Sequence, residues 1–426
     1  MSRATDFVTL PDVPRLTLAN LTAPSCLVGA AGSLAPLDLT IEGGRIVSGT
    51  GERVDMKGAM VFPAFVDLHT HLDKSQIWSR APNPDGTSDS ARLAVAADRT
   101  ARWSAADVRR RMEFALRSAF AHGTRAIRTH LDSFPPQHAI SFGVFRELKA
   151  AWAGRIELQA VNLCSVDVLG DAAAFGAIVD EVAASDGALG CIVMPHPELR
   201  PRLVGLLETA AKHGMAVDLH VDETGDPAST NLRDVAECVL ETGFDTPVTA
   251  GHCCSLAVQE EAEALATLDL VARAGMSVVS LPMCNLYLQG RGTGRTPRWR
   301  GITLVHEMKA RGISVSFASD NTRDPFYAYG DLDMLEVMRE ATRIGHLDHS
   351  DSDWTHTFTT NPARTAGFAT ASLEVGAPAD LVICKARSWT ELFARPQSDR
   401  VVLRGGRPID RTLPDYAELD DLMAVD

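Results

Sequence analysis

The histidines carry the most visible chemistry in this 426-residue sequence. His69 and His71 are separated by one residue at the end of an apolar run, and the period of two in a strand turns both imidazoles to the same face. His220, His252 and Asp320 end three later apolar runs. Three neutral imidazoles and one carboxylate form a mixed N/O ligand set suited to Zn²⁺ or Fe²⁺, with an open position for water. Such a water is a nucleophile near neutral pH, because a divalent metal can lower its pKa from about 15.7 to about 7.

Most of the other histidines have a simpler interpretation. A lone histidine is more often a hydrogen-bonded structural residue than a ligand, and we interpret seven in this way: His122, His138, His213, His306, His346, His349 and His356. His130 and His196 also end apolar runs, so a structural and a functional role are about equally expected. We predict that His130 supports the site rather than binds the metal. Chance would seldom place His69, His71 and His220 together at the ends of apolar runs.

Eight apolar runs must position these side chains. They are Val61–His71, Ala126–His130, Ile156–Cys164, Leu189–His196, Ala216–Glu223, Pro247–His252, Ser277–Pro282 and Ile313–Asp320. The segments between them, such as Asp107–His122 and Asp331–Ile344, have helical spacing. Alternating strands and helices predict right-handed βαβ units, and eight units predict an α/β fold of the (β/α)₈ TIM-barrel type. Since active sites of such barrels lie at the C-terminal ends of the strands, the candidate ligands should converge there.

The two chain ends have a different pattern. Short alternating runs flank Gly43-Gly44 near the start and Gly405-Gly406 near the end, and paired glycines between such runs indicate hairpins. We therefore predict a small β-sandwich domain built from residues 1–58 and 361–426. The metal-dependent hydrolase barrel would occupy residues 59–360 and interrupt it.

The composition excludes several classes of partner. Lys and Arg number 41 against 55 Asp and Glu, which gives a net charge of −14 and argues against nucleic acid or an anionic membrane surface. No apolar run approaches the roughly 18 residues of a membrane span, and no export signal pattern is present. Eight cysteines lie scattered without CxxC spacing, which is typical of reduced thiols. We expect a cytoplasmic protein with neither nucleic-acid nor membrane partners.

Several segments resemble one known superfamily. The sequence FPAFVDLHTHLD from Phe62 resembles the first-strand signature of the amidohydrolases, and GAPADLVI from Gly376 resembles their closing β-segment. HVDE at His220, NLYLQGR at Asn285 and SDNTRDPF at Ser319 are similar to motifs of its cytosine deaminase-like group. The resemblance extends over about residues 14–408.

This resemblance implies roles for the candidate residues. It implies one divalent metal, Zn²⁺ or Fe²⁺, with four ligands: His69, His71, His220 and Asp320. Glu223 would be the proton shuttle, His252 would orient or polarise the reacting group, and Asp320 would also accept the proton of the attacking water. No lysine ends the fourth run, where dinuclear relatives carry a carboxylated one, so one metal is expected. Taken singly, Glu223 also fits a solvated loop acid and Asp320 fits a helix cap.

Departures from the group pattern bear on the substrate. Ser165 stands where the resembling cytosine deaminases place a glutamine, and Asn321, Arg323 and Phe326 stand where they often carry an aspartate, an apolar residue and a tryptophan. A shorter residue 165 enlarges the pocket, and an arginine favours an anionic or carbonyl-rich ligand. A surface pairing of Arg323 with a neighbouring aspartate, Asp324 or Asp331, is about equally expected.

Two further residues are candidate contacts. The resemblance puts Gln289 at the pocket wall, and Lys74 directly follows the first-strand motif, although a loop lysine is usually only solvated.

The sequence therefore predicts a hydrolytic deaminase of an aminated N-heterocycle, larger or more oxidised than cytosine, such as a pterin. A first alternative is release of an alkylamine from an aminotriazine, or hydrolysis of a cyclic amide. A second is a non-catalytic scaffold, which the complete set of candidate residues disfavours. The group resemblance suggests a homo-oligomer acting on a small heterocyclic molecule.

Overall fold

The computed structural model describes residues 7–350, 353–396 and 399–424. Eight parallel strands form its centre: β6 (Phe65–Thr70), β7 (Thr124–Asp132), β8 (Glu157–Leu163), β9 (Ile192–Val193), β10 (Val217–Val221), β11 (Val248–His252), β12 (Ser277–Ser280) and β13 (Ser314–Phe317). They are hydrogen-bonded in two sheets, β6-β7-β8 and β9-β10-β11-β12-β13. Parallel bridges join the sheets, Ser165 to Ile192 on one side and Thr70 to Asp320 on the other. Each of the eight strands therefore has a parallel neighbour on both sides.

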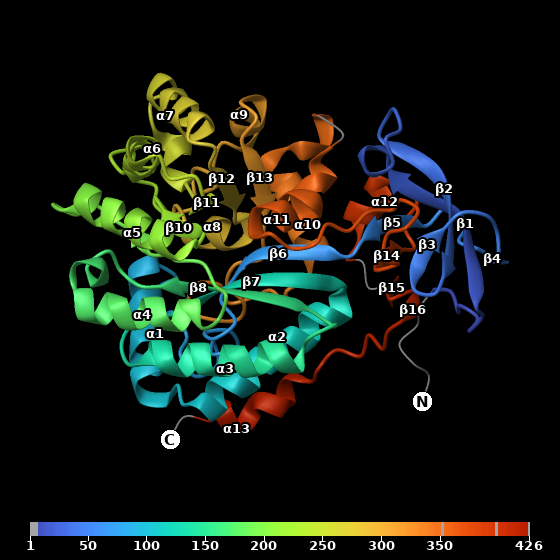
Figure 1. The fold of residues 1–426 in the computed structure, drawn as a ribbon, viewed down its shortest axis with the longest axis horizontal. Helices are drawn as coiled ribbons and strands as arrows, with labels where there is room; N and C mark the ends of the chain where they lie inside the picture. Colours follow the sequence, from blue (N-terminus) through green and yellow to red (C-terminus); the bar gives the residue numbers. More distant parts are fainter. Residues whose placement is uncertain (1–6, 351–352, 397–398, 425–426) are drawn as a thin grey trace.

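Helices surround these strands (Figure 1). They are α1 (Ser88–Arg102), α2 (Ala105–His122), α3 (Gln137–Ala151), α4 (Ala172–Ala183), α5 (Leu199–His213), α6 (Asn231–Thr242), α7 (Glu261–Arg273), α8 (Pro282–Leu288), α9 (Val305–Ala310), α10 (Met334–Gly345) and α11 (Thr360–Ala366). Local sequence sets their ends. In α2, for example, the Ser104 side chain accepts a hydrogen bond from the backbone of Asp107, and Gly123 ends the helix with a φ of 100°, as helix caps require.

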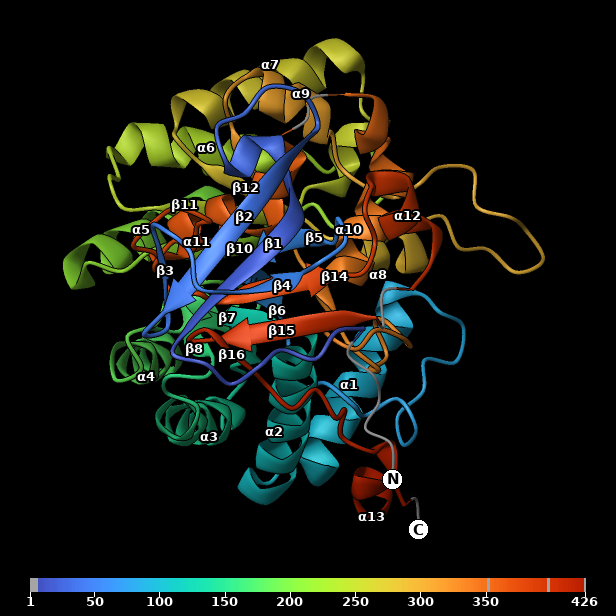
Figure 2. The same cartoon turned by 90° about the vertical axis from the view of Figure 1, so that its right-hand side faces the viewer.

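A second sheet lies to one side of the parallel strands (Figures 1 and 2). Its strands are β1 (Arg15–Pro24), β2 (Leu34–Glu42), β3 (Arg45–Val47), β4 (Glu52–Asp55), β5 (Met60–Pro63), β14 (Leu381–Cys384), β15 (Arg400–Arg404) and β16 (Arg407–Pro408). The order is β16-β15-β14-β5-β1-β2-β3, with β4 on β1. Both glycine pairs connect antiparallel strands, β2 with β3 and β15 with β16. The sheet reaches Pro63, a few residues beyond the boundary expected at residue 58.

The remaining elements are short. Helix α12 (Trp389–Ala394) follows β14, and α13 (Asp420–Met423) lies near the C-terminal end. The 3₁₀ turns are Ser25–Leu27, Val168–Gly170, Cys254–Val258, Leu347–His349, Trp354–Phe358 and Tyr416–Leu419. Within the described residues, no helix is both long and apolar enough to cross a membrane.

The second sheet contacts the helices around the parallel strands through a close apolar approach and a buried ion pair. A Cβ added at Gly123 would lie 2.4 Å from Cγ2 of Val382, so only glycine fits between α2 and β14. The Arg400 guanidinium of β15 donates to both carboxylate oxygens of Asp333, at 2.8 and 2.5 Å. Asp333 is also the N-cap of α10. Burial alone would raise the pKa of Asp333, but the charges of Arg400 and His122 outweigh it and lower that pKa.

Replacing Arg400 with methionine should destabilise the protein strongly. The substitution leaves the Asp333 carboxylate buried without its main partner, and breaking a buried pair in this way costs about 3–5 kcal/mol. Urea denaturation followed by circular dichroism should show a fall of this order in the free energy of unfolding.

The matched control is Arg387→Met, which breaks the solvent-exposed pair with Glu391 and should change stability little. The effect at Arg400 should also depend on pH. Because the pKa of Asp333 is lowered in the folded protein, the stabilisation is present above the ordinary carboxyl value and is lost as the pH falls through the lowered one. An equal fall in the free energy of unfolding in the Arg400 and Arg387 variants would contradict a stabilising role for the buried Arg400–Asp333 pair.

Candidate metal centre and active site

Four predicted ligand residues converge at the C-terminal ends of the parallel strands. Nε2 of His220 lies 3.2 Å from Nε2 of His69 and 3.3 Å from Nε2 of His71. Oδ1 of Asp320 lies 3.2 Å from Nε2 of His71 and 3.6 Å from Nε2 of His69. The corners of a tetrahedron with metal-ligand bonds of about 2.1 Å are about 3.4 Å apart. These separations therefore match a set of ligands around one small cation.

The chemistry of this set also fits a cation. His69, His71, His220 and Asp320 are all buried, and neither carboxylate oxygen of Asp320 has a hydrogen-bond partner. Burial lowers the pKa of all three histidines well below the ordinary value, so the rings are neutral and can offer lone pairs. A buried carboxylate without donors is costly unless it is paired or coordinates a metal. The residues present fit a divalent metal ion.

Strand register and backbone strain position the ligands. In β10 and β11, His220 pairs with Gly251, and Val221 with His252. A Cβ at Gly251 would lie 3.0 Å from Cε1 of His69, so this position favours glycine. Left-handed backbone turns the chain at the strand ends, with φ of 69° at His252, the last residue of β11, and 65° at Asp320, three residues after β13, although such values are unfavourable for non-glycine residues. The backbone N–H of Asp320 donates to the His69 carbonyl at 2.9 Å, which holds the turn against β6.

His130 lies beside this set. Its ring centroid is 4.0 Å from that of His69, and neither of its ring nitrogens has a hydrogen-bond partner. Nε2 of His130 is 3.8 Å from a carboxylate oxygen of Asp218, whose other oxygen accepts from Arg128 at 2.7 Å. His130 is thus near enough to support the site, and it also forms a possible ligand group with His69 and His220.

Other histidines have local structural contacts. His122 lies 2.8 Å from a carboxylate oxygen of Asp331, and Nε2 of His306 lies 2.8 Å from the Gly345 carbonyl. Nδ1 of His196 accepts from the backbone of Glu198 at 3.0 Å, and His196 is not among the residues that line the cavity described below.

A second group lies directly beside the four residues. Nδ1 of His252 is 3.5 Å from Oε1 of Glu223. The Asn285 amide nitrogen is 3.0 Å from that Nδ1 and 3.4 Å from the same Glu223 oxygen. Burial raises the pKa of Glu223 to about 7, against the lowering effect of Lys74 and Arg92, and burial lowers the pKa of His252 to about 3. Glu223 can therefore hold a proton near neutral pH while His252 stays neutral.

A cavity of about 370 Å³ opens onto these residues. Its lining includes the site residues His71, His220, His252 and Glu223, and three predicted substrate contacts, Gln289, Asn321 and Phe326. Lys74 also lines it, with Nζ 3.3 Å from Asp132 and 5.1 Å from the centre of the Phe326 ring. The side chain of Glu223 is 23% exposed, so it can meet a ligand.

Two predicted substrate contacts, Ser165 and Arg323, are not among the lining residues. Strand β8 ends at Leu163, which lines the cavity instead, while Ser165 lies beyond the strand and pairs with Ile192. Arg323 has a left-handed φ of 49°, and its Nε donates to Gln76 at 3.1 Å.

The Arg323 guanidinium also lies 4.1 Å from the centre of the Tyr416 ring. Arg323 thus contacts Gln76 and the C-terminal segment rather than the aspartates that the sequence suggested.

The sequence prediction missed several residues around the site. Leu163, Met194 and Arg92 line the cavity, and Asn285 contacts both Glu223 and His252. Leu163 and Met194 stand at or just after the ends of β8 and β9, and strand-end position was a usable signal. Arg92 lies on α1, where no spacing pattern marks it.

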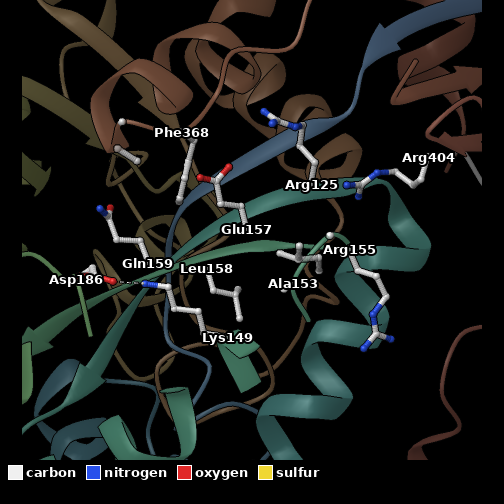
Figure 3. A pocket seen from close by; sticks show the side chains of 14 residues that line it. Arg125, Lys149, Ala153, Arg155, Glu157, Leu158, Gln159, Asp186, Phe368 and Arg404 are labelled. Atoms are coloured by element: carbon white, nitrogen blue, oxygen red, sulfur yellow. Dashed lines mark hydrogen bonds and ion pairs between the residues drawn. The ribbon is translucent and has the colours of Figure 1, made fainter. Parts of the chain in front are cut away.

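A larger hollow of about 530 Å³ lies elsewhere, beside the first residues of β7 and β8 (Figure 3). Arg125, Lys149, Arg155 and Arg404 line it together with Glu157. It contains none of the candidate histidines and lies at the N-terminal ends of the strands, opposite the end where barrel active sites occur. We therefore assign the candidate active site to the smaller cavity.

Comparison with known proteins agrees with this geometry. A family model described as the amidohydrolase family matches residues 165–410. A pterin deaminase of Rhizobium rhizogenes is 52% identical over 98% of this chain and 99% of its own. The N-isopropylammelide isopropyl amidohydrolase of a Pseudomonas species is 25% identical, over 87% of this chain and 93% of its own.

Solved structures are also similar. A crystal structure of the 5-methylcytosine deaminase of Klebsiella pneumoniae, liganded with 5-fluorocytosine, has a TM-score of 0.80 and 25% identity, covering 92% of this chain and 97% of that one. These similarities confirm the resemblance on which the sequence prediction drew. The chain belongs to the amidohydrolase family.

Proposed function

We propose that this protein is a hydrolytic deaminase that releases ammonia from an aminated N-heterocycle, and that its substrates are pterins. The observation that carries the proposal is the 52% identity to a pterin deaminase over nearly the whole chain. The similarity to a 5-methylcytosine deaminase structure supports the same reaction on a related ring. The protein is accordingly a hydrolase of C–N bonds.

The proposal includes the architecture that presents the site. The ring of eight parallel strands supports a (β/α)₈ barrel of the TIM type. We propose the barrel at residues 59–360 and a small β-domain at residues 1–58 and 361–426, whose strands share one sheet with β5 from the first residues of the barrel segment. A homo-oligomer in the cytoplasm remains a prediction.

We propose that His69, His71, His220 and Asp320 hold one divalent metal ion, Zn²⁺ or Fe²⁺. When bound, such an ion supplies activation of the attacking water near neutral pH. The unpartnered oxygens of Asp320 and the neutral imidazoles support this assignment.

Glu223 would move the protons of the reaction. Attack on an amidine carbon requires that a ring nitrogen gain a proton, and the amine then leaves after protonation. A carboxyl group whose pKa is about 7 can give and take protons at neutral pH. Asp320, whose pKa is raised by burial and by Glu223, would accept the proton of the attacking water.

His252 would stabilise the oxygen that becomes negative during attack. Its Nδ1 accepts from the Asn285 amide at 3.0 Å, which leaves the ring proton on Nε2. That Nε2 is buried and has no hydrogen-bond partner. A neutral ring with a free, oriented donor is suited to hydrogen-bond a developing oxyanion.

Gln289, Asn321 and Phe326 would contact the heterocycle, and Lys74 is a further candidate for a ring carbonyl. Phe326 offers an aromatic face beside the Lys74 ammonium. Contact of Ser165 and Arg323 with the substrate stays a prediction, and neither residue is among those that line the cavity.

The substrate class can be tested with purified enzyme. An ammonia-coupled assay over pterins, cytosine, 5-methylcytosine, guanine and aminotriazines should give the highest kcat/KM for a pterin. Efficient turnover of cytosine with pterins ignored would contradict the proposal. Release of an alkylamine or a ring-opened product would favour the alternative hydrolase.

A Glu223→Gln variant should bind metal normally and lose most of its activity. Removing a positioned acid-base group lowers kcat by about 10²- to 10⁴-fold, while the four proposed ligands remain. Steady-state kinetics and metal analysis of the same sample check both parts. The control is Glu147→Gln, which alters an exposed acid paired with Arg109 and should leave kcat unchanged. Full activity in the Glu223 variant would remove this residue from the mechanism.

A Lys74→Met variant should shift the pH dependence of the reaction. Glu223 must be protonated to donate to the ring, so kcat/KM should fall as the pH rises through a pKa of about 7. Lys74 lowers that pKa electrostatically, so removing its charge should move the alkaline limb to higher pH. Lys74→Arg keeps the charge and should leave the limb in place. A limb at the same pH in all three proteins would disprove the coupling.

A further inference from the structure

One buried thiol beside the site has no role in the proposed reaction. Cys284 is fully buried, and its Sγ lies with a carboxylate oxygen of Glu223 and one of Asp320, all within 4.8 Å of one another. Sγ is also 3.5 Å from Oδ1 of Asn321 and 3.8 Å from the Phe326 carbonyl. The thiol is therefore surrounded by oxygen acceptors.

The position of the thiol follows from the chain path after β12. Helix α8 begins at Pro282, only two residues after β12 ends at Ser280. Proline favours the first turn of a helix, and this first turn carries Cys284 and Asn285. Asn285 contacts Glu223 and His252 from it.

One carboxylate oxygen of Asp320 is available as a metal ligand in this group. Its Oδ1 is the atom that faces His69 and His71. Its Oδ2 is also buried and makes no short hydrogen bond, and the Cys284 thiol is the side chain that interacts with this carboxylate. A single ion among the histidines would thus leave one carboxylate oxygen free toward a neighbouring ion.

We propose that Glu223, Cys284 and Asp320 form a second cation site, selective for thiophilic divalent ions such as Zn²⁺, whose occupation inhibits the enzyme. One thiolate and two carboxylates suit a borderline-soft ion rather than Mg²⁺ or Ca²⁺. On binding, the S–H proton of Cys284 and any proton on Glu223 leave to solvent, and a sulfur-metal bond forms. An ion on Glu223 prevents this carboxylate from carrying protons. The inhibition rests on the proposed function, whereas the binding does not.

The ion can reach this group from the cavity. Glu223 lines the cavity and is partly exposed, whereas Cys284 and Asp320 lie buried behind it. A bulky heterocycle in the cavity would cover this route, so substrate and the second ion should compete.

The test is titration of the one-metal holoenzyme with Zn²⁺ and, separately, with Co²⁺. Wild-type protein should take up a second ion by metal analysis, and Co²⁺ should produce a thiolate-to-metal charge-transfer band in the near ultraviolet. At low substrate concentration, saturating Zn²⁺ should reduce kcat/KM by at least about 100-fold, as loss of an acid-base group does, and high substrate should relieve this inhibition. Mg²⁺ should neither bind as a second ion nor inhibit the enzyme.

A Cys284→Val variant should lose the second ion, the absorption band and the inhibition, and should keep its activity without added zinc. If valine does not fit at this buried position, the Cys284→Ala variant allows the same test. The matched control is Cys384→Ala, which removes a thiol equally buried in β14 and should behave as wild type.

Uptake of a single ion by wild-type protein, or a second ion and inhibition that persist without Cys284, would overturn the inference. A wild-type protein that deaminates no heterocycle but shows the Cys284-dependent band would overturn the proposed function alone, because the ion count and the spectrum need no turnover.

Discussion

The structure depends on how a buried carboxylate is compensated. Asp320 is removed from solvent, the neutral imidazoles of His69 and His71 face its Oδ1, and His220 lies beside both rings. A carboxylate buried in this way is costly unless it is paired or coordinates a metal, so a bound metal ion is the natural counter-charge. The same ion would explain why His69, His71 and His220 face one another with their Nε2 atoms. The other residues of the site are arranged around this need for a counter-charge at Asp320.

Positioning these groups requires strain and compensation elsewhere. Non-glycine residues take left-handed backbone at His252 and Asp320, where costs of about 1–3 kcal/mol per residue are typical. The strand ladders on either side of these turns fix them, since Asp320 is hydrogen-bonded to β6 and His252 pairs within β10 and β11. The buried Lys74 ammonium is held beside the cavity by Asp132, which also pairs with Arg99. Stability supplied by the rest of the fold thus maintains a costly arrangement at the strand ends.

Local periodicity made much of this predictable. The spacing of His69 and His71 indicates one strand face, the glycine pairs indicate hairpins, and strand ends locate His220 and Asp320. Contacts between distant segments and unusual backbone conformations could not be predicted from local sequence. The left-handed turn at Arg323 directs its side chain to Tyr416, more than ninety residues later in the chain. Strand β8 ends two residues before Ser165, which leaves Ser165 outside the residues that line the cavity, and no local signal marks that end. Likewise, the thiol of Cys284 reaches Asp320 only because α8 starts so close to β12.

X-ray anomalous diffraction from crystals of active enzyme, recorded at the zinc and iron absorption edges, tests the central claim most directly. The account predicts a peak within about 2.0–2.2 Å of ligand atoms from His69, His71, His220 and Asp320. Crystals of enzyme that turns over substrate but shows no peak there, or shows its peak among other residues, would contradict the account.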